Sequence, residues 1–263
     1  MSPEDRILPL EGVENFRDYG GYAVPGGRRV VRGRLWRSAH HGGATDADLE
    51  RIAGLGLAAV VDLRRPTERA NQPSRRPEGF AGAVIDCDAG DQAEPPHVAF
   101  LRETDLSAES ARAFFRDYYR RAPFEPRHLE LFTRYFEALG AGRPVLIHCT
   151  AGKDRTGLLA ALTHHLLGVA EADMLADFEL TNMAARIEAR LAQVTESMTE
   201  SLGRRPSETA VRAFLGVDRT YLEEAFAAIR QEAGSVEAYL STLGVDASAA
   251  EGLRAAWLEP ARA

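Results

Sequence analysis

The run from His148 to Gly157 reads HCTAGKDRTG, with one cysteine and one arginine at a spacing that suits chemistry on a phosphate group. A loop that closes around a tetrahedral oxyanion turns its backbone N–H groups inward, and a helix that begins behind it adds the positive end of its dipole. These groups stabilise a thiolate at the start of the loop, where Cys149 stands, and the thiolate is the nucleophilic form of cysteine. Six positions later, Arg155 can present its planar fork to two phosphate oxygens. We therefore predict that Cys149 attacks phosphorus and that Arg155 binds the phosphate.

The other positions of this loop have physical roles of their own. Gly152 allows the close approach and the unusual dihedral angles that such a loop needs. Thr156 offers a hydroxyl that can hydrogen-bond the sulfur when it leaves in a second step. Lys153 is the one lysine among 32 lysine and arginine residues, and its compact charge fits beneath a phosphorylated substrate, although one lysine must fall somewhere by chance. The predicted phosphate-binding residues are Thr150, Ala151, Gly152, Lys153, Asp154, Arg155 and Thr156.

The loop needs a strand before it and a helix after it, and the pattern predicts both. Residues 144–148 form a compact apolar run, whereas residues 158–167 have an apolar helical pattern that ends at Gly168. Buried strands of the parallel kind are also predicted at 58–63 and 83–85. A strand, a glycine-bearing turn and a helix therefore hold the motif.

Other segments complete the framework. A proline- and arginine-rich loop is expected at 66–77. Helices are predicted at 46–53, with Thr45 as N-cap, and at about 107–119 and 128–139. The glycine-rich segments 15–22 and 32–38 predict a hairpin or a small meander.

The chain beyond residue 170 is mostly helical in pattern. Residues 183–215 are amphipathic, rich in arginine and glutamate, and interrupted by Gly203 and Pro206, which is consistent with a pair of lid helices. The aromatic and leucine residues after 220 predict terminal helices that pack on the core. With 263 residues, 45% of them hydrophobic, residues 1–263 are expected to form a single domain.

Composition limits the partners and the compartment. A formal net charge of -7 argues against nucleic acid as the main partner, because such binders usually carry a basic excess. Two cysteines far apart in sequence suggest a reducing compartment. The start of the chain has no apolar signal region, and no apolar run is long enough to span a bilayer. Cytoplasmic localisation is the expectation, with export without a cleaved signal left open.

Each candidate residue also has a simpler interpretation. Cys149 could be an inert buried cysteine at a strand end, but its strand, turn and helix context favours the nucleophile. Cys87 is expected to pack in the core, with a redox partnership to Cys149 as the alternative. His164 and His165 are adjacent on a helix and face different directions, so they do not indicate a metal site. We predict no metal and no cofactor.

The motif and four further segments, NFRDYGGY, RGRLWRS, VVDLRRPTE and DFELTN, resemble blocks of the protein tyrosine phosphatase superfamily. Within that superfamily, the segments resemble the recurring blocks of the bacterial tyrosine phosphatase B-like group and occur in the same order. That group acts on phosphotyrosine and often on phosphoserine, phosphothreonine or phosphoinositides. The resemblance implies an α/β fold in which a twisted, largely parallel central sheet is flanked by helices. It also implies no metal, a helical lid inserted after the catalytic helix, and a catalytic loop filled by Cys149, Lys153, Asp154 and Arg155.

The sequence leaves two candidates for the general acid, because no Trp-Pro-Asp segment of the kind found in most tyrosine phosphatases is present. Asp154 is preferred, since its place in the loop lies near the rim, where a carboxyl can reach the ester oxygen. Asp62 is the second candidate, at the carboxyl end of a parallel strand. It could instead anchor Arg64 or Arg155.

These residues predict an enzyme, a cysteine-dependent protein-tyrosine phosphatase that forms a phosphocysteine intermediate. Its expected partners are phosphorylated proteins or phosphoinositide head groups. A catalytically silent phosphate-binding module is the alternative, but binding alone does not need the thiolate that Cys149 and Arg155 support. Sulfur transfer by a rhodanese-like loop ranks last.

Overall fold

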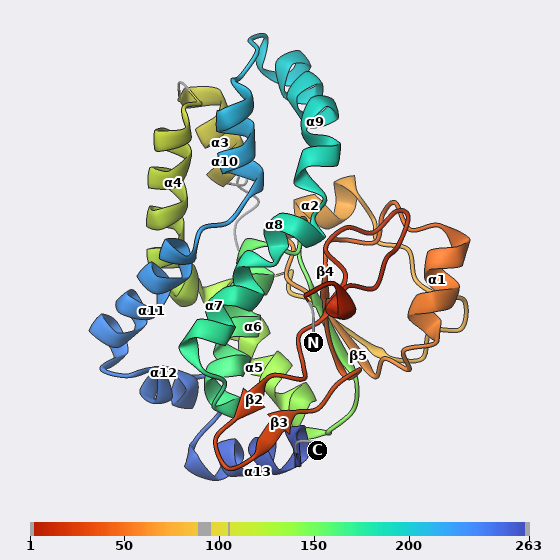
Figure 1. The fold of residues 1–263 in the computed structure, drawn as a ribbon, viewed down its shortest axis with the longest axis vertical. Helices are drawn as coiled ribbons and strands as arrows, with labels where there is room; N and C mark the ends of the chain where they lie inside the picture. The colour runs from red at the N-terminus through yellow and green to blue at the C-terminus, as the bar shows by residue number, and fades with distance from the viewer. Residues whose placement is uncertain (1–2, 89–95, 105, 261–263) are drawn as a thin grey trace.

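The computed structural model describes residues 3–88, 96–104 and 106–260. Within these ranges a five-stranded sheet forms the centre of the molecule (Figure 1). Its strands lie in the order β1 (Arg17–Asp18), β4 (Leu35–Ser38), β7 (Val145–His148), β5 (Ala59–Asp62) and β6 (Ala83–Ile85). β1 is antiparallel to β4, and the remaining neighbours are parallel. The predicted α/β fold with a largely parallel sheet is confirmed.

Strand β7 occupies the middle of this sheet because its side chains are apolar on both faces. Val145 and Ile147 pack into the large core with helices α5 (Pro126–Gly140) and α6 (Asp154–Leu167), whereas Leu146 faces a second core beside α1 (Asp46–Ala53). This division follows the two-residue period of a strand. His148 is in register with Ser38 of β4 and with Asp62 of β5, so Cys149 begins its loop where three strands end.

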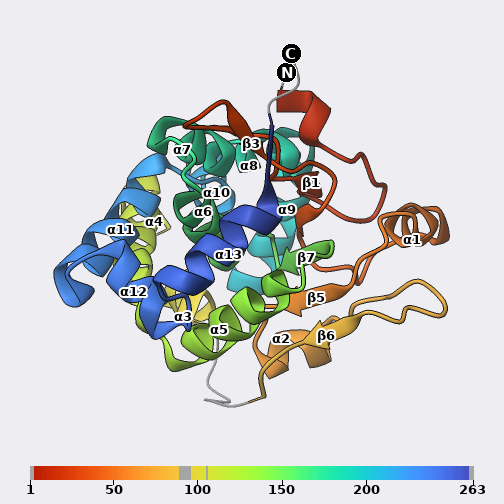
Figure 2. The ribbon, with the colours of Figure 1, turned by 90° about the horizontal axis from the view of Figure 1, so that it is seen from below.

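Helices cover both faces of the sheet (Figure 2). They are α1 (Asp46–Ala53), α2 (Pro66–Asn71), α3 (Pro96–Glu103), α4 (Ala108–Arg121), α5 (Pro126–Gly140), α6 (Asp154–Leu167), α7 (Glu171–Glu179), α8 (Thr181–Ala184), α9 (Ile187–Leu202), α10 (Glu208–Leu215), α11 (Arg219–Ala233), α12 (Val236–Thr242) and α13 (Ala247–Trp257). Short 3-10 turns span Pro3–Arg6 and Ala122–Phe124. Figure 1 shows α9 and α10 projecting with α3 and α4 at one end of the molecule.

Several local predictions are confirmed. Thr45 caps α1 by accepting a hydrogen bond from the backbone N–H of Asp48. Gly168 ends α6 in the left-handed region, with φ 84°. The segments 15–22 and 32–38 pair through β1 and β4, with the hairpin of β2 (Ala23–Val24) and β3 (Arg28–Val30) between them.

Two features differ from the predictions. The segment 66–77 begins with α2 instead of a continuous loop, because Pro66 suits the first helical position and the Glu68 carboxylate accepts from the Arg65 N–H at 2.7 Å. A second sheet, formed by β2, β3 and β8 (Leu258–Pro260), was not predicted. The sequence also predicts a polar loop that runs to about Pro96, and residues 89–95 of it lie outside the described residues.

None of the helices in the described ranges combines the length and the apolar character needed to cross a bilayer. Cytoplasmic localisation stays a prediction.

Candidate active site

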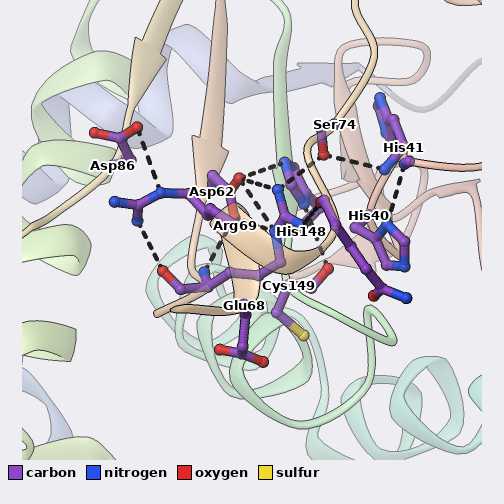
Figure 3. Close-up of polar contacts among 12 residues, drawn as sticks. His40, His41, Asp62, Glu68, Arg69, Ser74, Asp86, His148 and Cys149 are labelled. Carbon is purple, nitrogen blue, oxygen red and sulfur yellow. Dashed lines mark hydrogen bonds and ion pairs between the residues drawn. The ribbon is translucent and has the colours of Figure 1, made fainter. Parts of the chain in front are cut away.

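Cys149 lies directly after β7, and α6 begins at Asp154, as the motif requires. Its side chain is buried, yet it borders a cavity of about 190 Å³. In Figure 3 the Cys149 side chain and the Glu68 carboxylate extend toward the same side. The predicted loop residues that line the cavity are Thr150, Ala151, Lys153, Asp154 and Arg155.

Gly152 is held tightly against the end of β4. Its φ is +65°, a conformation that residues with a side chain rarely adopt. A Cβ atom at this position would lie 2.3 Å from both the carbonyl carbon and the oxygen of Ser38. Because both atoms belong to the backbone of a buried strand, the loop requires glycine here.

Arg155 binds a carboxylate in the geometry predicted for a phosphate. Its two terminal nitrogens donate to the two oxygens of Glu68 at 2.6 and 2.7 Å. The guanidinium also donates to the Leu63 carbonyl at 3.1 Å and to the Thr150 hydroxyl at 3.3 Å. Burial by itself lowers the pKa of Arg155, but the Glu68 carboxylate raises it well above its ordinary value. Arg155 therefore stays charged and presents a planar fork toward the cavity.

Glu68 was missed by sequence reasoning. Although burial favours its protonated form, Arg155 and the Thr150 hydroxyl hold the pKa of Glu68 far below the ordinary value. It is thus an anion bound where a phosphate is expected. The available signal was Pro66 followed by a glutamate at the third helical position, which indicates a helix start.

Lys153 connects the loop after Cys149 to α10. Its ammonium donates to the Phe214 carbonyl at 2.7 Å and lies 3.9 Å from the centre of the Phe115 ring. The nearest carboxylate oxygen belongs to Asp154 at 3.6 Å. Burial lowers the pKa of Lys153, and Asp154 opposes that shift.

The two candidate acids lie in different surroundings. Asp154 lines the cavity and accepts a hydrogen bond from the Tyr119 hydroxyl at 3.1 Å. Asp62 is buried and accepts from Arg64 at 2.9 and 2.7 Å, outside the set of cavity-lining residues. Burial alone would raise the pKa of Asp62, but His148 and Arg64 hold it well below the ordinary range. The structure therefore bears out the alternative that Asp62 anchors Arg64.

His148, which precedes Cys149, is fully buried. Burial lowers its pKa to about 4, against the opposing effect of Asp62, so the imidazole is neutral at pH 7. Its ring stacks on His41 with 5.3 Å between centroids. Figure 3 shows Asp62, His148 and His41 grouped away from the Cys149 sulfur.

The cationic groups that line the cavity are Arg65, Lys153 and Arg155.

The remaining predicted residues can also be placed. Thr156 is fully buried, and its hydroxyl has no hydrogen-bond partner within the described part of the chain. Cys87 is packed in the large core, as predicted, and its thiol donates to Glu130 at 3.1 Å. His164 contacts the Tyr19 carbonyl, whereas His165 contacts Glu237. Across residues 3–88, 96–104 and 106–260, no cluster of histidine, cysteine and acidic side chains could hold a metal ion.

Aromatic side chains form the outer walls of the cavity. Phe114, Phe115 and Tyr118 come from α4, whereas Phe214 and Leu215 end α10. The Phe115 and Phe214 rings lie 5.7 Å apart and join the two helices. A cavity lined by charged groups of the loop after Cys149 and by aromatic side chains of α4 and α10 suits a phosphate carried on an aromatic group.

Comparisons with known proteins place this chain in a family. The model of a tyrosine phosphatase family matches residues 8–259, and the chain belongs to that family. A Cupriavidus necator protein, provisionally named as a tyrosine-protein phosphatase, is 35% identical over 93% of this chain and 87% of its own length. The triple specificity protein phosphatase PtpB of Mycobacterium tuberculosis is 31% identical over 94% of this chain and 98% of its own. A tyrosine-protein phosphatase of Nostoc commune is 27% identical over 80% and 69%. The resemblance drawn from the sequence motifs is confirmed.

Proposed function

We propose that this protein hydrolyses phosphotyrosine in proteins through a phosphocysteine intermediate, with Cys149 as nucleophile and Arg155 as phosphate clamp. The observation that carries the proposal is the placement of Cys149, Arg155 and their connecting loop around one cavity. The bidentate contact of Arg155 with Glu68 supports it, because a carboxylate and a phosphate present similar pairs of oxygens.

The reaction proceeds in two steps. The Cys149 thiolate attacks phosphorus, the bond from phosphorus to the tyrosyl oxygen breaks, and the Asp154 carboxyl gives its proton to that oxygen. Water then attacks the phosphocysteine, the bond between sulfur and phosphorus breaks, and the water proton passes to Asp154. Arg155 exchanges Glu68 for phosphate oxygens and stabilises the transition-state charge. The Thr156 hydroxyl, which has no partner within the described ranges, donates to the departing sulfur.

Residues 1–263 form one phosphatase domain in this proposal, with 183–215 as a helical lid. Phe214 and Leu215 line the cavity from α10, which supports a cover over the entrance. Breadth toward phosphoserine, phosphothreonine and phosphoinositides is proposed as well, and the triple specificity in the name of the mycobacterial relative supports that breadth.

The first test is hydrolysis of p-nitrophenyl phosphate and of a phosphotyrosyl peptide by the purified protein. Orthovanadate should inhibit, because it occupies the anion site and reaches the sulfur, whereas EDTA should leave the rate unchanged. Binding of the phosphopeptide without turnover would favour the silent module. Activity lost to the chelator and restored by a divalent cation would contradict the cysteine mechanism.

Lys153 provides a test of lipid specificity. Lys153→Ala should lower activity on multiply phosphorylated inositol lipids by about 10-fold or more, since a charged hydrogen bond is worth about 1.5 to 3 kcal/mol, with a smaller effect on p-nitrophenyl phosphate. Lys153→Arg is the matched control, because it keeps the charge and should lose less. The comparison is of kcat/KM for the two substrates in each variant. Equal losses on both would assign Lys153 to loop structure and to its contact with Phe214.

A further inference from the structure

Three carbonyl groups of the catalytic loop are bound from outside the cavity by the N-terminal part of the chain. The Asn15 amide donates to the carbonyls of Gly152 at 2.8 Å and Ala151 at 3.2 Å. Arg37 donates to the same Gly152 carbonyl at 3.0 Å and to the Lys153 carbonyl at 3.4 Å. Each contact joins residues more than 100 positions apart in the sequence.

These contacts affect anion binding because the direction of a carbonyl group fixes the direction of the N–H group that follows it. In a trans peptide unit the C=O and the following N–H point in opposite directions, and the chain has no cis peptide bond among its described residues. Holding the carbonyls of Ala151, Gly152 and Lys153 outward therefore turns the N–H groups of residues 152–154 the other way. Within the described ranges, none of these three N–H groups has a protein acceptor. They remain available for phosphate oxygens.

The donors themselves are fixed by a buried charged network. Arg17 donates to the Asn15 side-chain oxygen, and Arg37 donates to Asp177 at 2.9 Å. The second Arg17 nitrogen lies 3.7 Å from the same Asp177 oxygen. All four side chains are buried. Two guanidinium groups thus face one carboxylate, which leaves a net positive charge behind the loop.

We propose that Asn15 and Arg37 are positioning residues that hold the loop N–H groups toward the phosphate. The proposal rests on the function proposed above. It assigns part of the anion binding of the candidate active site to the segments NFRDYGGY and RGRLWRS. Because this net charge lies in a poorly screened interior, it also favours a bound phosphate.

Asn15→Asp is a sharp test because it keeps the size of the side chain and its contact with Arg17. The aspartate oxygen cannot donate to the loop carbonyls, and it adds a negative charge beneath them. We expect orthovanadate to bind about 10- to 100-fold more weakly, in line with the usual cost of unpaired buried groups. The pH midpoint for alkylation of Cys149 by iodoacetamide should move upward, because the added charge disfavours the thiolate.

Two further variants separate positioning from loss of fold. Asn15→Gly tolerates the positive φ of 57° and removes the donor without adding charge, so it should weaken vanadate binding less than Asn15→Asp. Thr181→Val removes a hydroxyl that accepts from Arg17 at 3.1 Å, within the same network but without touching the loop. It should lower the melting temperature and change vanadate affinity less than about 2-fold, because it leaves the loop donors in place.

The outcomes are distinguishable. Wild-type vanadate affinity and an unshifted alkylation midpoint in folded Asn15→Asp would overturn the inference, as would an equal loss of affinity in Thr181→Val. If the wild-type protein neither binds vanadate nor shows a reactive Cys149, the proposed phosphatase function itself fails.

Discussion

Cys149→Ser should lower the turnover of p-nitrophenyl phosphate and of phosphotyrosyl peptides on the order of 10⁴-fold or more, a size typical of losing a covalent nucleophile. A serine hydroxyl does not ionise near neutral pH, so the first step loses its attacking anion. The loop N–H groups and Arg155 remain, so the variant should still bind a phosphotyrosyl peptide. Steady-state kinetics and titration calorimetry measure the two quantities separately.

Cys87→Ser is the matched control, because Cys87 is buried in the core and lies outside the cavity lining. It should keep most of the turnover at a temperature where it is folded. Substantial activity in Cys149→Ser would remove Cys149 from the mechanism. Equal inactivation of both cysteine variants would favour a redox partnership between Cys87 and Cys149, the alternative that the sequence left open.

Asp154→Asn should depress hydrolysis of alkyl and tyrosyl phosphates by about 10²- to 10³-fold, since general acid catalysis commonly contributes 10²- to 10⁴-fold. Hydrolysis of an activated aryl phosphate should fall much less, because its leaving oxygen needs little protonation. The measurement is the slope of log kcat/KM against the leaving-group pKa. This slope should become steeper in the Asp154→Asn variant.

Asp62→Asn provides the comparison. Asp62 forms a buried ion pair with Arg64 at 2.7 Å, and breaking such a pair commonly costs about 3 to 5 kcal/mol of stability. We therefore expect a large fall in unfolding free energy and an unchanged leaving-group slope. A steeper slope in Asp62→Asn alone would transfer the acid role to Asp62. An unchanged slope in both would point to water or to an acid not yet recognised.

The sequence predicted those parts of the site that depend on neighbouring residues. The run from Cys149 to Arg155 specifies its own turn, with Gly152 at the point of closest approach, and the apolar residues before and after it specify the strand and the helix. Asp154 was likewise placed at the cavity by its position in the loop.

Contacts between distant segments were not predictable in the same way. Glu68 was missed because its helix was read as part of a loop, and its partner Arg155 lies 87 positions away. Asn15 and Arg37 were present in the recognised blocks, but no local pattern indicates that they reach the loop carbonyls. These pairings depend on the order of strands in the sheet, which periodicity alone does not determine.

The aromatic walls of the cavity have a consequence for how this scaffold can evolve. The proposed reacting groups, Cys149 and Arg155, lie directly after β7 and on α6, whereas Phe114, Phe115 and Tyr118 belong to α4 and Phe214 belongs to α10. Substitutions at Phe114 or Tyr118 can reshape this entrance without replacing the residues proposed to break the phosphate ester, whereas Phe115 and Phe214 also contact the Lys153 ammonium. Preference among phosphorylated molecules can therefore diverge between descendants while the chemical step is inherited unchanged.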